Sequence, residues 1–83
     1  MPIDQALIND EVSLSANPTA GVSIVIIEDG PGEIFLEAEK PPGTWNQVKN
    51  GEGVFVTLTP DLSLNYRFRA RGVLASRNVY LGP

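Results

Sequence analysis

Carboxylates are the side chains in this sequence that suggest acid–base chemistry. Two adjacent pairs occur, Asp10-Glu11 and Glu28-Asp29, and a pair of carboxylates can serve a hydrolase as general acid and general base. Both pairs border expected turns or strand ends, where acidic residues are common for conformational reasons. The sequence contains no His and no Cys, so no serine has a histidine to activate it. These patterns predict that the protein is not an enzyme.

A metal site is the second chemistry that acidic side chains allow. Glu28, Asp29 and Glu33 bracket a turn and carry oxygen atoms that suit a hard cation such as Ca²⁺. Their spacing matches no EF-hand loop, and Ca²⁺ takes about six or more oxygen ligands. The lack of Cys and His also removes thiolate and imidazole ligands. We therefore expect no metal and no cofactor.

Three arginines alternate along one expected strand and form the most distinctive charge pattern. Arg67, Arg69 and Arg71 face one side of that strand. One interpretation is a patch that binds an anion or an acidic partner. The other is pairing across strands with Glu37 and Glu39, since opposite charges facing each other contribute up to about 1 kcal/mol. Unpaired like charges would repel, which favours the second interpretation.

Aromatic residues are the candidates for contacts with a partner. Trp45 follows a Pro/Gly-rich stretch. An exposed ring there would stack on a sugar or anchor a protein, and a buried ring would close one end of the core. Phe35, Phe55 and Tyr80 fall on outward or second faces of expected strands. Together they would form a patch large enough to mark an interface, unless the face assignment of one strand is inverted.

Length and charge limit the classes of partner. The chain has 83 residues and a net charge of −4, so it lacks the basic balance that phosphate binding requires, and we expect no nucleic acid. No apolar run approaches the roughly 18 residues of a membrane span, and the start lacks the pattern of a signal peptide. We expect no membrane partner and synthesis in a cytoplasm. One domain with a thin core is expected at this size.

Short strands separated by turn residues account for most of the chain. The expected strands cover residues 11–14, 22–28, 33–39, 44–49, 53–59 and 64–71, and the segments 73–75 and 77–81 form one bent strand or a final hairpin. Asn50-Gly51 predicts a tight hairpin between two of these strands. Six or seven strands without a convincing helix predict an all-β fold, either a small antiparallel β-sandwich or a partly open barrel.

Residues 1–10 are expected to form a short N-terminal arm beside a single β-sandwich domain, residues 11–83. Ile3 and Leu7 are four residues apart, so one helical turn would present both on one side. Ten residues are too few for a stable isolated helix, and an extended segment docked on a neighbour is the alternative. In either form, Ile3, Leu7 and Ile8 would bury apolar surface at a subunit contact.

The stretch 56–73 resembles the end of an immunoglobulin-like or fibronectin type III-like sandwich. Leu58, Pro60 and Tyr66 are similar to the residues that precede a corner and open an alternating strand in those folds. The resemblance implies that Tyr66 is a corner tyrosine bonded to upstream backbone. The spacing from Pro60 to Tyr66 is longer than in the family, and strand 22–28 lacks the core Trp that fibronectin-type modules often carry.

In size, acidity and all-β build the chain also resembles accessory proteins of tailed-bacteriophage virions. The resemblance implies a non-enzymatic virion protein, a capsid decoration or tail component, that forms a homo-oligomer and docks on a larger viral shell or tail protein. The expected partner-binding residues are Ile3, Leu7, Ile8, Phe35, Trp45, Phe55, Tyr80 and Leu81. The alternative is a carbohydrate- or ligand-binding β-sandwich module anchored by Trp45, with a surface glycan as its partner.

Overall fold

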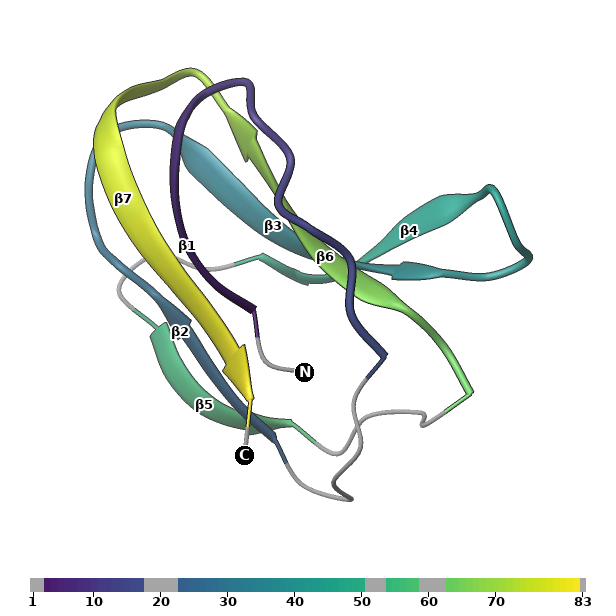
Figure 1. Ribbon diagram of the computed structural model, residues 1–83. Coiled ribbons are helices and arrows are strands. Elements are labelled where there is room, and N and C mark those ends of the chain that lie inside the picture. The colour runs from purple at the N-terminus through teal and green to yellow at the C-terminus, as the bar shows by residue number, and fades with distance from the viewer. Residues whose placement is uncertain (1–2, 18–22, 51–53, 59–62, 83) are drawn as a thin grey trace.

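Antiparallel β-strands make up the fold (Figure 1). The computed structural model describes residues 3–17, 23–50, 54–58 and 63–82. The strands are β1 (Ile3–Asn9), β2 (Ser23–Ile27), β3 (Glu33–Glu39), β4 (Trp45–Asn50), β5 (Val54–Leu58), β6 (Tyr66–Arg71) and β7 (Val73–Gly82). Within these residues no helix is long and apolar enough to cross a membrane. The predicted all-β fold is confirmed.

The strands form two sheets that pack face to face as a small β-sandwich. A four-stranded sheet has the order β1-β7-β2-β5, and a three-stranded sheet has the order β4-β3-β6. β4 and β5 follow each other in sequence but pair with β3 and β2 respectively. The tight hairpin expected at Asn50-Gly51 is therefore wrong, because β4 and β5 belong to different sheets; Gly51 itself lies outside the described residues. The last segment is one strand of 10 residues, β7, instead of a hairpin.

The first strand corrects the prediction of a separate arm over residues 1–10. β1 is an edge strand of the four-stranded sheet and pairs with β7, with Ile3 opposite Leu81. Ile3 and Leu7 are both buried in the core. A separation of four residues puts two side chains on one face of a strand as well as on one face of a helix. Pairing with β7 favours the strand, and the β-sandwich domain includes it.

After β1 the chain crosses to the other sheet. Asn9 has a positive φ of 60°, a backbone conformation that Asn adopts more readily than most residues. Residues 11–17 then run along β6 and form bridges to it at Val12 and Ala16. The N–H of Ser13 donates to a carbonyl of β6 at 2.9 Å. The segment thereby covers the edge of β6 that β3 leaves open.

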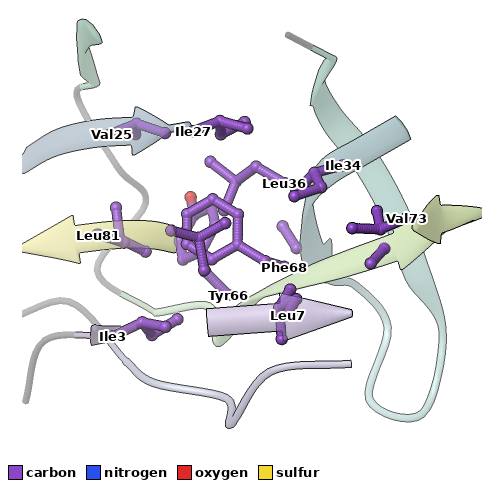
Figure 2. Packing of buried hydrophobic residues seen from close by; sticks show 13 residues of the cluster. Ile3, Leu7, Val25, Ile27, Ile34, Leu36, Tyr66, Phe68, Val73 and Leu81 are labelled. Carbon is purple, nitrogen blue, oxygen red and sulfur yellow. The ribbon is translucent and has the colours of Figure 1, made fainter. Parts of the chain in front are cut away.

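The core lies between the two sheets and uses alternate residues of their strands (Figure 2). On β3 and β6, the inward residues predicted from the alternation are buried: Ile34, Leu36, Ala38, Tyr66, Phe68 and Ala70. In Figure 2, Ile3 and Leu7 of β1 enter the cluster from one side, and Val25 and Ile27 of β2 enter from the other. The remaining residues of β3 and β6 face outward, because successive side chains of a strand point to opposite faces.

The position of β7 differs from that of the last strand in an immunoglobulin domain. The pairings of β2 with β5 and of β3 with β6 match those of the corresponding strands in immunoglobulin sandwiches. In those domains the last strand joins the sheet that contains the third and sixth strands. Here β7 lies between β1 and β2 in the other sheet. The placement of β7 therefore differs from the one that the immunoglobulin-like resemblance implies.

Candidate interaction surfaces

Two arginines and one glutamate form a compact ionic cluster on the outer face of the three-stranded sheet. Glu37 of β3 lies opposite Arg67 of β6. Its Oε1 accepts a hydrogen bond from Arg67 Nε and its Oε2 accepts one from Arg69 Nε, each at 3.0 Å. The Glu37 side chain is 7% exposed, and those of the two arginines are 24% and 35% exposed. Among the described residues, only the Nε of each guanidinium has a protein acceptor.

Aromatic rings flank this cluster. The guanidinium carbon of Arg67 lies 4.2 Å from the centroid of the Trp45 ring, and that of Arg69 lies 4.8 Å from the centroid of the Phe35 ring. Both distances are typical of cation–π contacts. A guanidinium held by a ring and a carboxylate has little freedom left to lose when it binds a partner. We name these five side chains the stacked face: Trp45, Arg67, Glu37, Arg69 and Phe35.

The cross-strand pairing predicted for the arginines is confirmed, with one change of partner. Arg71 Nη2 lies 3.0 Å from Oε1 of Glu33 instead of pairing with Glu39. The cause is register, since Glu33 is the residue opposite Arg71. Glu39 accepts hydrogen bonds from the Gly43 N–H (2.7 Å) and from the Asn65 amide (3.3 Å). These ion pairs do not use every N–H donor of the arginines, so the remaining N–H groups can bind a partner.

Apolar side chains border the stacked face. Val12 bridges to Arg69, which places it on the same outer face, and it is 43% exposed. Leu14, two residues further on, is 73% exposed, and Trp45 is half-buried. The prediction that Phe35 contacts a partner is wrong. Its ring is on the outer side of the sheet, but Arg69 lies over it and the residue is buried.

The four-stranded sheet carries a row of large residues across its outer face. Ile26 of β2 lies opposite Phe55 of β5 and Tyr80 of β7, and Tyr80 lies opposite Asp4 of β1. Ile26 is 38% exposed although β2 is an inner strand, and Tyr80 is half-buried. The register thus aligns two residues predicted to bind a partner, although the side chain of Phe55 lies outside the described part of the structure. We name the described side chains of this row, Tyr80 and Ile26, the apolar row.

Three other residues predicted to bind a partner belong to the core of the chain itself. Ile3, Leu7 and Leu81 are buried in the cluster between the sheets. These predictions are wrong, because β1 and β7 pack the three side chains inside the sandwich. Ile8, on the opposite face of β1 from Leu7, is half-buried and keeps some access to a partner.

Arg77 is a buried cation that the sequence pattern did not reveal. It is 2% exposed; its Nε donates to the Glu28 carbonyl at 2.7 Å, and its Nη1 donates to the Gly32 carbonyl at 3.0 Å. Its Nη2 is buried without a hydrogen-bond partner in the described part of the chain. The alternation of Arg77 with Val79 and Leu81 is the signal that places it on the inward face of β7. Its hydrogen bonds attach the turn before β3 to β7.

The carboxylates considered for catalysis or metal binding are engaged in local contacts. Glu28 accepts hydrogen bonds from the backbone and side chain of Asn78. Asp29 accepts one from the Gly30 N–H (3.0 Å), and Glu33 forms the ion pair described above. Within the residues that the structure describes, no three His, Cys, Asp or Glu side chains are grouped to hold a metal ion.

Comparison of the chain with family models, curated proteins and solved structures finds no match. The stacked face and the apolar row are therefore the features from which a function can be inferred.

Proposed function

We propose that the chain is a non-enzymatic structural module that assembles through protein–protein contacts, as a capsid decoration or tail component of a virion docked on a larger shell or tail protein. The observation that supports assembly is Ile26, exposed in an inner strand and aligned with Tyr80 and Phe55. The virion part of the proposal is supported by the length of 83 residues, the net charge of −4 and the all-β build.

The apolar character of β2 on both faces favours a covered outer surface. Val25 and Ile27 are buried in the core, and Ile24 and Ile26 alternate with them on the outer side. A sheet face in contact with water normally alternates with polar residues, whereas a strand that is apolar on both sides is typical of a sheet covered on both faces. A partner on this face would remove apolar area from water, which stabilises a complex by about 25 cal/mol per Å².

The edge strands of the two sheets favour assembly through the outer sheet faces over assembly by strand pairing between chains. β1 and β4 each take part in a ladder with a register shift of the kind that a β-bulge produces. Residues 11–17 cover the outer edge of β6. Bulged and covered edges hinder pairing with a strand of another chain. Three of the four edge strands are thus bulged or covered, with β5 as the exception, so the outer faces are the better candidates for assembly.

Molar mass measured by light scattering across a dilution series tests this proposal. We expect an oligomer of the 8.9 kDa chain and a shift toward monomer in Ile26→Lys, because an interface would bury the new charge. Leu74→Lys is the control for a charge placed elsewhere on the same outer face, since Leu74 is 79% exposed and lies about 20 Å along β7 from Tyr80. A wild-type monomer at every concentration, or an Ile26→Lys oligomer of unchanged mass, would contradict the proposal.

A glycan-binding module anchored by Trp45 is the second candidate. It is favoured by the half-exposed ring and by the exposed neighbouring amides of Asn46 and Gln47. It has less support than assembly, because the Arg67 guanidinium lies over the ring at 4.2 Å and occupies a face on which a sugar would stack. Glycan-array binding that Trp45→Ala abolishes would support this candidate, and an array without signal would count against it.

A further inference from the structure

Resting on the proposed assembly, we infer that successive copies of this chain bind head to tail, with the apolar row of one copy against the stacked face of the next. In this contact the Asp4 carboxylate, at the end of the row, meets the Nη groups of Arg67 and Arg69. The partner of the stacked face is therefore a second copy of the same chain.

The Arg67–Arg69 cluster on one outer face and Asp4 on the other carry opposite charge. The chain has 10 acidic and only 6 basic residues, yet Arg67 and Arg69 share one carboxylate, that of Glu37. Two guanidinium groups and one carboxylate leave one positive charge within this cluster, while over the whole face Glu33, Glu37 and Glu39 balance the three arginines. On the other face Asp4 is exposed, and among the described residues its carboxylate has no hydrogen bond and no ion pair. Matching of a positive and a negative patch fixes the orientation of two partners and suppresses wrong contacts.

Both faces also combine their charge with apolar side chains. Asp4 lies in the same register row as Ile26, two strands away, which corresponds to about 10 Å. At the border of the stacked face, Val12 lies beside Arg69 and Leu14 is largely exposed. Each face thus offers an ionic contact next to apolar area, the combination that an interface needs for both specificity and burial.

The geometry makes this contact heterologous. The apolar row and the stacked face belong to different sheets and lie on opposite sides of the sandwich (Figure 1). A contact between two different surfaces of identical chains produces a ring if the rotation closes and a filament if it does not. The molecule measures 33 × 25 × 18 Å, so a broad face is comparable with the about 800 Å² per partner that a standard interface buries.

The stacked face is organised for a carboxylate before one binds. Glu37 holds the Nε atoms of Arg67 and Arg69 at 3.0 Å. The Trp45 and Phe35 rings pack against the two guanidinium groups. Arginine presents its donors in a rigid fork, so its Nη groups stay available for a second carboxylate. Because the side chains are already ordered, binding costs little additional side-chain entropy.

Complementation between two variants, each altered on one face, tests the head-to-tail contact. Ile26→Lys disables the apolar row, and Leu14→Glu places a carboxylate beside the stacked face, where it would repel Asp4 of the next copy. Both changes are at exposed positions, and circular dichroism checks that the sheets are retained. Each variant alone is expected to be monomeric. An equal mixture is expected to form a dimer of twice the 8.9 kDa chain mass, because each variant contributes one intact face.

The other outcomes separate this inference from the proposed function. Leu14→Glu oligomers of wild-type mass, or a mixture of two monomeric variants that stays monomeric, would overturn the head-to-tail contact and leave assembly through the apolar row intact. An Ile26→Lys oligomer of wild-type mass would overturn the proposed function itself. If either variant loses its β-sheet spectrum, Asp4→Lys and Val12→Glu replace them on the same two faces.

Asp4→Asn measures the ionic part of the contact. It removes one charge without changing the size of the side chain, so we expect association to weaken by about tenfold and to depend less on salt. Asp29→Asn is the control, because it changes the net charge equally at an exposed turn outside both faces. Equal weakening in the two variants would show that Asp4 makes no specific contact, and would overturn its role.

Discussion

Arg77 donates a hydrogen bond from Nη1 to the carbonyl oxygen of Gly32 at 3.0 Å, so a buried cation on the last strand holds the turn that precedes β3. Within the described residues no carboxylate pairs with it. Burial of a charge is costly unless hydrogen bonds replace water. Backbone carbonyls supply them here, including that of Glu28 at 2.7 Å. Arg77 thereby joins β7 to the segment between β2 and β3.

Replacement of Arg77 by Met should lower the free energy of unfolding by about 2–4 kcal/mol. Met keeps much of the side-chain volume but leaves the Glu28 and Gly32 carbonyls without a donor, and each unsatisfied buried group costs about 1–3 kcal/mol. Urea unfolding followed by circular dichroism measures the change. Arg71→Met is the control, because its ion pair is exposed and such pairs contribute about 0–1 kcal/mol. Equal losses in both variants would refute a special role for Arg77.

Strands with a polar residue at an inward position are the ones that the sequence does not predict correctly. The alternation over residues 33–39 predicts β3 and its inward face correctly, because no polar residue interrupts the inward set. In β1, Gln5 occupies the position between Ile3 and Leu7 and hides the alternation. Its side-chain oxygen accepts a hydrogen bond from the Leu14 N–H at 2.8 Å. The hydrogen bond from Leu14 satisfies the inward amide oxygen of Gln5. Leu14 belongs to another segment, so the sequence around Gln5 does not reveal this bond.

The candidate surfaces are predictable only in part for a related reason. Ionic pairing of β6 with β3 follows from alternation on the two strands. The burial of Phe35 beneath Arg69 does not follow, because it depends on how a neighbouring strand places its side chain over the ring. The alignment of Ile26 with Tyr80 depends on β7 lying beside β2. That strand order is a property of the whole sandwich and cannot be read from either segment.

Glu37→Gln should destabilise the sandwich by about 1–3 kcal/mol. The substitution keeps the shape of the side chain but removes the charge that Arg67 and Arg69 share, and removal of one member of a largely buried pair leaves the other charges uncompensated. The partial exposure of both arginines reduces the loss below that of a fully buried pair. Chemical denaturation gives the value. Glu33→Gln, in the exposed pair with Arg71, should cost under about 1 kcal/mol. Equal losses in Glu33→Gln and Glu37→Gln would contradict the idea that burial strengthens the ion pairs of Glu37.

Gly32 and Gly43 provide a matched pair that separates a steric clash from backbone strain. Both have positive φ, 94° and 88°. A Cβ at Gly32 would lie 2.5 Å from the Gly72 carbonyl oxygen, whereas at Gly43 nothing lies within 4 Å. Gly43→Ala should cost only the left-handed strain, about 1–2 kcal/mol, and Gly32→Ala should cost about 3 kcal/mol or more because backbone must also move. Thermal unfolding compares them, and similar losses would argue against close packing of the β2–β3 turn on Gly72.

We expect Leu7 to be essential to the fold. If residues 1–10 were an arm that docks on another protein, replacement of Leu7 would leave the fold stable. Leu7→Ala removes a fully buried side chain and should cost about 2–5 kcal/mol, from lost burial and the cavity that remains. Ile8→Ala is the control on the other face of β1, where the side chain is half-buried, and it should cost clearly less. Deletion of residues 1–10 should abolish the cooperative unfolding transition, since it removes β1 together with two core residues. A truncated chain that keeps a sharp transition and loses only its oligomeric state would restore the interpretation of this segment as an arm.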